Sequence, residues 1–352
     1  MPNWSASMQQ TFEYYKVNPN TWMDETIIDT IVDATIEYDE SVGTLGSASI
    51  TSTEMIDECY VRIYLITIQN GVKERFVLGT FLVQAPADNF DGRNHSITLD
   101  AYTPLIEMKE KMPSIGYTLL KTRNIMDAAS TICREVTRGP NVEASSTKTL
   151  DYNFVANTDD TWLTFLTDLI SLADFKFDVD AMGNILFAPI QDIASLQPVF
   201  TYTDDNSSVL YPSISIDRDL YGIPNVVEVV WSSGLETMYA RAVNSDPNSP
   251  ISTVNRGREI VKRVTDPGLP GLPSQTQLNE YATQLLRNVS SLEYKITYTH
   301  GYLPVRVGDC IRLNYGLAGL SNIKAKVVSQ SIRCTPGCPV TETASFTTNL
   351  WR

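Results

Sequence analysis

Histidine is almost absent from this sequence, with only His95 and His300 among 352 residues. Any catalytic scheme in which a histidine acts as acid, base or partner of a nucleophile therefore has almost no material. The sequence also lacks G-x-S-x-G, H-E-x-x-H, G-x-x-x-x-G-K and a G-x-G-x-x-G that follows a predicted strand. These absences exclude the common signatures of hydrolases, metalloproteases and nucleotide-binding proteins. We expect a protein that is not an enzyme and holds no cofactor.

Paired cysteines and metal-binding clusters are also scarce. The five cysteines are odd in number and mostly lie in apolar contexts, which is typical of buried free thiols. Only Cys334 and Cys338 are close in sequence, on either side of a Pro-Gly turn, and they could form a disulfide. Because the loop is so short, that disulfide would stabilise the fold by at most about 2 kcal/mol. No second cysteine pair or nearby histidine completes a zinc site. Residues 178–183 match part of a calcium loop, but Met182 occupies a ligand position and Pro189 stands where the closing glutamate is needed, which predicts a hairpin turn.

The sequence also has few basic residues and lacks long apolar runs. With 27 Lys and Arg against 41 Asp and Glu, the formal net charge is −14. Such a chain repels a phosphate backbone, so we expect no specific nucleic-acid binding, although an acidic wall could border a DNA conduit without binding DNA. No uninterrupted apolar run approaches the length that crosses a bilayer, and the first ten residues show no secretion signal. We expect a soluble protein with no membrane segment.

Residues 302–332 contain the clearest combination of a strand pattern and a turn. Apolar residues alternate with polar ones on both sides of Gly308, which predicts a strand bent at that glycine, and residues 325–332 are predicted to return antiparallel. The alternating apolar residues are Val305, Val307, Ile311 and Leu313. Gly308 would supply the bend, and Asp309 would accept hydrogen bonds from backbone N–H groups at this structural turn. A catalytic Asp309 has no partner nearby in the sequence.

Short strands at close spacing predict a small β-barrel in residues 1–104. The clearest signal is a hairpin of residues 60–68 and 76–84 around Asn70-Gly71, because this dipeptide favours the turn that matches strand twist. The apolar spacing of residues 27–36 fits a helix or a strand, and its β-branched residues favour the strand.

Residues 105–198 change to helical periodicity and predict a small α/β domain. One helix begins after Asn124, and a second is capped by Thr158 or Asp159 and followed by a hairpin. Adjacent carboxylates such as Asp159-Asp160 and Asp204-Asp205 imitate a hydrolase pair, but neighbours on a strand point apart.

Strand signals return at 199–235 and 293–352, which predict a second β-barrel. A small α/β unit at 236–292 interrupts it, with a loop at 268–273 before a helix capped by Ser274. The predicted fold class is therefore mainly β with α+β character: two small β-barrels with interleaved small α/β domains.

Two groups of like charge stand out. The acidic cluster is Asp33, Glu37, Asp39 and Glu40, and the basic cluster is Arg256, Arg258, Lys262 and Arg263. We expect the acidic cluster to face a channel or solvent and the basic cluster to face a partner subunit, where arginine can pair with carboxylates. The alternative is that both are ordinary solvated faces.

The order of these elements resembles the baseplate hub proteins of contractile-tailed phages, which are related to the late control gene D family and to the barrel half of type VI spike proteins. The segments that carry the resemblance are TWMDETIIDTIVDATIEYDESVGTLGSASI, FVLGTFLVQAPADNFDG, TDDTWLTFLTDLISLADFKFDVDAMGNILFAP, YGIPNVVEVVW, SPISTVNRGREI and HGYLPVRVGDCIRLNYGLAGL. The resemblance implies a non-catalytic homotrimer whose six barrels form a pseudo-sixfold ring, joining a tail tube to a central spike.

The resemblance also implies where the protein works and what it contacts. It implies a virion protein of the tail baseplate, assembled in the host cytoplasm, with a tail tube or distal tail protein, a spike, and a baseplate wedge or tape-measure protein as partners. DNA would pass without specific binding. Contractile, bacteriocin and long non-contractile tails all remain open. The competing hypotheses are a glycan- or receptor-binding module that uses its Tyr and Trp side chains and a carboxylate-based hydrolase.

Overall fold

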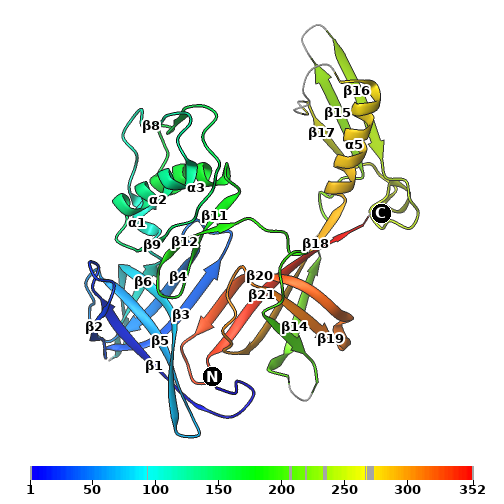
Figure 1. Ribbon diagram of the computed structural model, residues 1–352. Helices are drawn as coiled ribbons and strands as arrows, with labels where there is room; N and C mark the ends of the chain where they lie inside the picture. The colour runs from blue at the N-terminus through cyan, green and yellow to red at the C-terminus, as the bar shows by residue number, and fades with distance from the viewer. Residues whose placement is uncertain are drawn as a thin grey trace. The chain divides into compact units, whose positions relative to one another are not determined.

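The computed structural model describes residues 2–92, 94–205, 208–218, 220–232, 236–265, 267 and 273–350. The chain divides into two compact units. Unit 1 comprises Met1–Ile214 and Thr297–Ala344, and unit 2 comprises Ser215–Ile296 and Ser345–Arg352. Strands dominate the described residues, which confirms the prediction of a mainly β protein (Figure 1).

Unit 1 is built around one large sheet of 13 strands, counted over the described residues. They are β1 (Gln9–Val17), β2 (Asp24–Ile27), β3 (Ile31–Asp39), β4 (Gly46–Ser52), β5 (Tyr60–Gln69), β6 (Val72–Asp91), β7 (Asn94–Tyr102), β13 (Phe200–Thr203), β14 (Leu210–Arg218), β18 (Ser291–Gly301), β19 (Cys310–Tyr315), β20 (Leu320–Arg333) and β21 (Pro339–Asn349). They pair in the order β14-β18-β21-β20-β3-β4-β7-β6-β5-β1-β2, with β19 on β20 and β13 on β19. A short 3-10 helix, η1 (Gly316–Ala318), follows β19. β14, β18 and β21 also contribute residues to unit 2.

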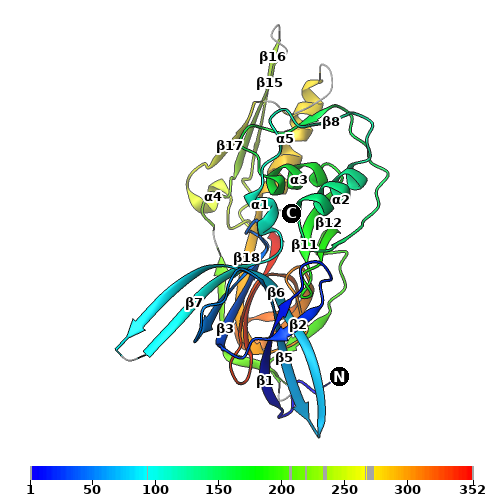
Figure 2. The ribbon, with the colours of Figure 1, turned by 90° about the vertical axis from the view of Figure 1, so that its left-hand side faces the viewer.

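Local sequence sets several of these strands. Asn70 and Gly71 both have positive φ, 51° and 81°, which is the backbone of the tight turn that matches strand twist, so the predicted hairpin of β5 and β6 is confirmed. The residues around 27–36 are strands β2 and β3, as their β-branched content predicted. β6 and β7 stay paired as far as Asp91 and Asn94 and extend as a two-stranded arm (Figure 2).

Strand β20 joins the two halves of this sheet. Its first part pairs with β19, from Cys310↔Lys326 to Tyr315↔Leu320, and its last five residues pair with β3, from Ser329↔Asp39 to Arg333↔Thr35. At 14 residues it is long enough for both partners. Over the described residues the hydrogen-bonded path is open, ending at β2, β13 and β14, so the two closed barrels stay a prediction.

The segment 105–198 has its own apolar core. Its helices and strands are α1 (Ile106–Glu110), β8 (Thr118–Leu119), α2 (Ile125–Val136), β9 (Asn141–Val142), β10 (Phe154–Val155), α3 (Trp162–Ser171), β11 (Phe175–Val179) and β12 (Ile185–Pro189). α2 begins as predicted, with the Asn124 side chain accepting a hydrogen bond from the Asp127 backbone N–H. The predicted caps of α3 are wrong. Thr161 caps that helix instead, because the Thr164 hydroxyl accepts from the Thr161 N–H while the Thr161 hydroxyl accepts from the Thr164 N–H.

Unit 2 is a helix on a small sheet. Strands β15 (Val226–Ser232), β16 (Thr237–Val243) and β17 (Val261–Val264) pair in the order β16-β15-β17, and α4 (Thr253–Arg256) lies between β16 and β17 in sequence. Helix α5 (Gln275–Val289) begins at the predicted cap Ser274, and Leu278, Ala282 and Leu286 bury its apolar face. Most of the loop at 268–273 and residues 351–352 lie outside the described residues. The four-part domain division stays a prediction.

Candidate functional site

The segment before β19 is a tight turn rather than a strand. Strand β19 starts at Cys310, so the prediction of one bent strand that includes Val305 and Val307 is wrong. The turn is closed twice: the Arg306 backbone N–H donates to Asp309 Oδ2 at 2.8 Å, and the Asp309 N–H donates to the Arg306 carbonyl at 3.1 Å. A side chain that satisfies the backbone in this way favours a turn over a strand ladder.

Gly308 occupies the left-handed part of this turn. Its φ is +96°, and its N–H donates to the Val327 carbonyl at 2.8 Å, which ties the turn to β20. A Cβ built on Gly308 meets no atom within 4 Å, so the requirement for glycine comes from the backbone and not from crowding. Burial raises the pKa of the neighbouring Asp309, and its hydrogen bond from Arg306 opposes that rise.

Gly308→Val is therefore expected to lower the free energy of unfolding by about 1–3 kcal/mol, the usual cost of a β-branched residue at positive φ. The measurement is denaturant unfolding followed by tryptophan fluorescence. Gly301→Ala is the matched control, because Gly301 lies on β18 without positive φ and a Cβ there makes only an ordinary 3.7 Å contact with the Gly337 carbonyl oxygen. If Gly308→Val is as stable as the parent, the turn places no special demand on residue 308.

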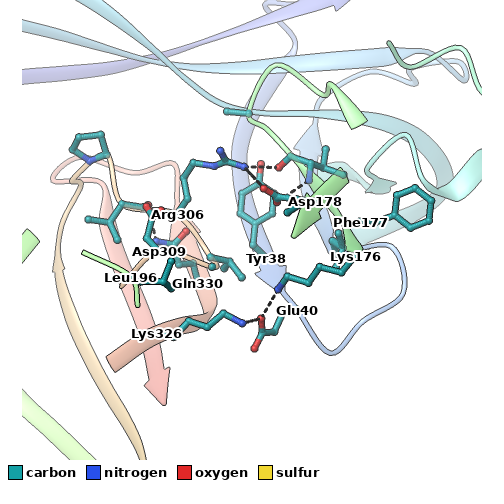
Figure 3. A pocket seen from close by; sticks show the side chains of 18 of the residues that line it. Tyr38, Glu40, Lys176, Phe177, Asp178, Leu196, Arg306, Asp309, Lys326 and Gln330 are labelled. Carbon is teal, nitrogen blue, oxygen red and sulfur yellow. Dashed lines mark hydrogen bonds and ion pairs between the residues drawn. The ribbon is translucent and has the colours of Figure 1, made fainter. Parts of the chain in front are cut away.

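This turn lines a cavity of about 560 Å³ inside unit 1. The other walls come from the end of β3, the first half of β6, the hairpin β11–β12 and strand β20 (Figure 3). The cavity therefore lies where the two halves of the large sheet meet the segment 105–198. We call it the junction cavity.

Most charged groups of the junction cavity are paired within its walls. Glu40, directly after β3, accepts hydrogen bonds from Lys176 of β11 at 3.2 Å and from Lys326 of β20. Arg306 bonds Asp178 at 3.2 Å and the Val179 carbonyl at 3.1 Å. These contacts hold the hairpin β11–β12 against β3, β20 and the turn, so the charged groups join segments that are distant in sequence.

A second polar group is fully buried between β13, β18, β20 and β21. Glu342 is its centre, with one oxygen accepting from Tyr298 at 2.7 Å and Tyr202 at 3.1 Å, and the other from Gln330 at 2.6 Å. His300 Nε2 lies 3.3 Å from the second oxygen. The side chains of Glu342 and His300 are both 0% exposed. We call this set of side chains the Glu342 network.

Both ring nitrogens of His300 have polar neighbours within this network. Its Nδ1 lies 2.5 Å from the Gly301 carbonyl oxygen, which can only accept, so Nδ1 carries a proton. Its Nε2 lies 3.1 Å from the Tyr202 hydroxyl and 3.3 Å from the Glu342 carboxylate. Burial by itself would raise the pKa of Glu342, but the hydrogen bond and charge of His300 and the donors Tyr298 and Gln330 hold it below its usual range.

A third polar group surrounds Arg62 of β5, which is 1% exposed. The guanidinium donates to Thr80 Oγ1 at 2.9 Å, to Asp24 Oδ1 at 2.8 Å and to the backbone carbonyls of Trp22 and Met182 at 3.2 Å each. Met182 lies at the tip of the hairpin β11–β12. Arg62 therefore holds that tip against the large sheet.

Metal-ligating side chains do not cluster in the part of the chain that the structure describes. Among the described residues no three His, Cys, Asp or Glu side chains gather as a metal site would require. All five cysteines are free, and Cys334 and Cys338 are both buried thiols. Trp22 and Trp162 pack against apolar cores. No described helix has the length and apolar character that a membrane span needs.

The basic cluster lies in unit 2. Arg256 donates to the backbone carbonyls of Ile223 and Leu220, and Arg263 bonds Glu228 at 2.7 Å. Arg258 and Lys262 are exposed. Their role toward a partner subunit stays a prediction. In the acidic cluster, Glu37 is exposed, whereas Glu40 belongs to the junction cavity.

Solved structures of two tail proteins and of a chain in a PdpA-VgrG complex have a fold similar to this chain. The chain is similar to the tail protein from Neisseria meningitidis MC58, with a TM-score of 0.65 and 11% identity over 97% of this chain and 98% of that one. The 43 kDa tail protein of prophage MuSo2 from Shewanella oneidensis gives a TM-score of 0.65 and 11% identity over 95% and 98%. A chain of a PdpA-VgrG complex gives 0.58 and 9% identity over 98% of this chain and 66% of that chain.

These similarities show a shared fold over nearly the whole chain. No protein-family model matches the sequence. No curated protein matches it either. The chain therefore shares a mainly β fold with these tail proteins, and its own role is a matter for proposal.

Proposed function

We propose that this chain is a structural protein of a phage-type tail, a homotrimeric baseplate hub whose ring joins the tail tube to the central spike. The observation that carries the proposal is the fold shared with two tail proteins over 95% or more of each chain.

The organisation of unit 1 supports a ring. The two halves of its sheet are joined by β20, and each half would supply one barrel-like element, giving six in a trimer. Among the described residues, β2, β13 and β14 lie at ends of the sheet, and such edges pair readily with a neighbouring chain. A closed trimer would cover those edges.

The net charge of −14 suits a channel that DNA or a tape-measure protein crosses without binding. The proposed partners are a second and third copy of this chain, a tail tube or distal tail protein and a spike, with a wedge or tape-measure protein as further candidates. The proposed location is the virion baseplate.

The mass of the purified chain in solution tests the trimer. We expect a particle of three times the 39.2 kDa chain mass at micromolar concentration, measured by light scattering or mass photometry. We also expect the double variant Arg258→Glu/Lys262→Glu to weaken the trimer at low salt, and salt near about 1 M to weaken the parent trimer, because surface charges are screened there.

The matched control is Lys109→Glu/Lys295→Glu, which makes the same charge change at exposed positions outside the basic cluster. A monomeric parent would contradict the hub. If both double variants form the trimer equally well, the basic cluster is not part of the interface. That result would not contradict the trimeric hub.

A further inference from the structure

The junction cavity has a cationic end that its own carboxylate does not neutralise. Lys176 and Lys326 reach the same oxygen of Glu40, from opposite sides in Figure 3. Burial lowers the pKa of Lys326, and the neighbouring Lys176 ammonium adds to that lowering against the effect of Glu40. Two positive charges are therefore held together around one negative charge.

The other charged side chains of the lining have partners within the cavity wall. Arg306 is matched by Asp178, and Asp309 accepts from the backbone N–H of Arg306. The three cations and three carboxylates of the lining balance in number, but the excess of positive charge is at Glu40 and the excess of negative charge is at Asp309. An added anion is favoured only at the lysine end.

Apolar side chains complete the walls. Leu45, Phe177, Leu196, Val305 and Ile332 all contribute to the lining. A volume of about 560 Å³ lies in the range of pockets that bind small ligands or a few side chains. The cavity therefore suits a group that combines one carboxylate with a compact apolar body.

We propose that the junction cavity binds a carboxylate and an adjacent branched apolar side chain of a partner polypeptide, with the carboxylate against Lys176 and Lys326. The inference rests on the proposed function, since a tail hub is surrounded by other polypeptides. The same lining also offers hydrogen-bond donors and acceptors to peptide amides, from Arg306, Asp309 and Gln191. A plain acyl chain could not form those hydrogen bonds. The partner recognised is thus one that presents an acidic side chain beside leucine or a similar residue.

Calorimetric titration of the full chain with capped dipeptides tests this site. N-acetyl-Leu-Glu-amide is expected to bind at least about tenfold more tightly than N-acetyl-Leu-Gln-amide, a difference of about 1.4 kcal/mol for one charged contact. Lys326→Met is expected to abolish the preference, and Lys176→Met, at a more exposed lysine, is expected to reduce it without loss of folding. Lys324→Met is the control, because Lys324 is two residues away on β20 and bonds the Ala194 carbonyl instead.

Equal binding of the two dipeptides, or no binding at millimolar concentration, would overturn the proposal. Tight binding of decanoate without binding of either dipeptide would identify a free fatty acid as the ligand and would also overturn it. The mass of the same sample is measured in parallel, so that loss of the trimer and loss of the cavity's preference are separate results.

Discussion

Glu342→Gln is expected to lower the free energy of unfolding by about 3 kcal/mol or more, because it removes a buried charged acceptor that several donors share. The carboxylate of Glu342 accepts from Tyr202, Tyr298 and Gln330 and faces His300 Nε2, and the whole network is buried. An amide of the same shape keeps the volume but loses the charged acceptor and directs an NH₂ group at other donors. Denaturant unfolding at neutral pH measures the loss.

The same variant gives a pH signature. Because the pKa of Glu342 is lower in the folded protein than in the unfolded chain, the carboxylate contributes stability above its unfolded pKa of about 4.3 and loses that contribution as the pH falls below it. The difference in the free energy of unfolding between the parent and Glu342→Gln should therefore be largest at pH 7. It should become progressively smaller below about pH 4. Glu37→Gln, at an exposed position on β3, is the control and is expected to stay within about 0.5 kcal/mol of the parent at pH 7. A constant difference across this pH range would mean that packing, and not charge, makes Glu342 important.

Arg62→Met is expected to cost about 3 kcal/mol or more, because it removes every donor of a buried guanidinium while keeping most of the apolar stem. Thr80 and the carbonyls of Trp22 and Met182 would each lose a partner, and Asp24 would lose its closest cation. Asp24 also bonds Arg75 and Tyr64, which limits the loss at that carboxylate.

Two measurements check this expectation. Denaturant unfolding gives the change in stability, and limited proteolysis reports whether the hairpin β11–β12 has separated from the large sheet. Lys73→Met is the matched control, since Lys73 is 60% exposed and its ion pair with Glu13 should contribute less than about 1 kcal/mol. A stable Arg62→Met with an unchanged digestion pattern would show that apolar packing alone holds the hairpin.

The parts of the fold that depend on neighbouring residues were predictable from the sequence. The Asn70-Gly71 turn and the caps Asn124 and Ser274 are local signals with a direct physical cause. The start of α3 was missed because several consecutive residues are suitable caps, and the hydroxyl of Thr164 decides in favour of Thr161. The segment before β19 was missed because alternation of apolar residues also occurs in a turn closed by an aspartate.

The sites depend on contacts between distant residues, which no pattern in the sequence reveals. Lys176 and Lys326 are 150 positions apart and meet only because β11 and β20 both approach Glu40. His300 did offer a signal. It continues the alternation of Ile296 and Tyr298 on β18, which places it on the buried face, where an ionisable side chain requires a partner. Its partner Glu342 could not be named without the pairing of strands.

The pairing of β20 with β3 also bears on how the chain folds during synthesis. One edge of β3 pairs with β4, and on the other edge residues 35–39 pair with residues 329–333. That second edge stays open until residues 329–333 have left the ribosome. Closing so long a loop is slow, and an open strand edge invites pairing with other chains. A nascent or truncated chain that ends before residue 329 would therefore be the species most prone to aggregate, and growth temperature or chaperone supply would decide the yield of folded protein.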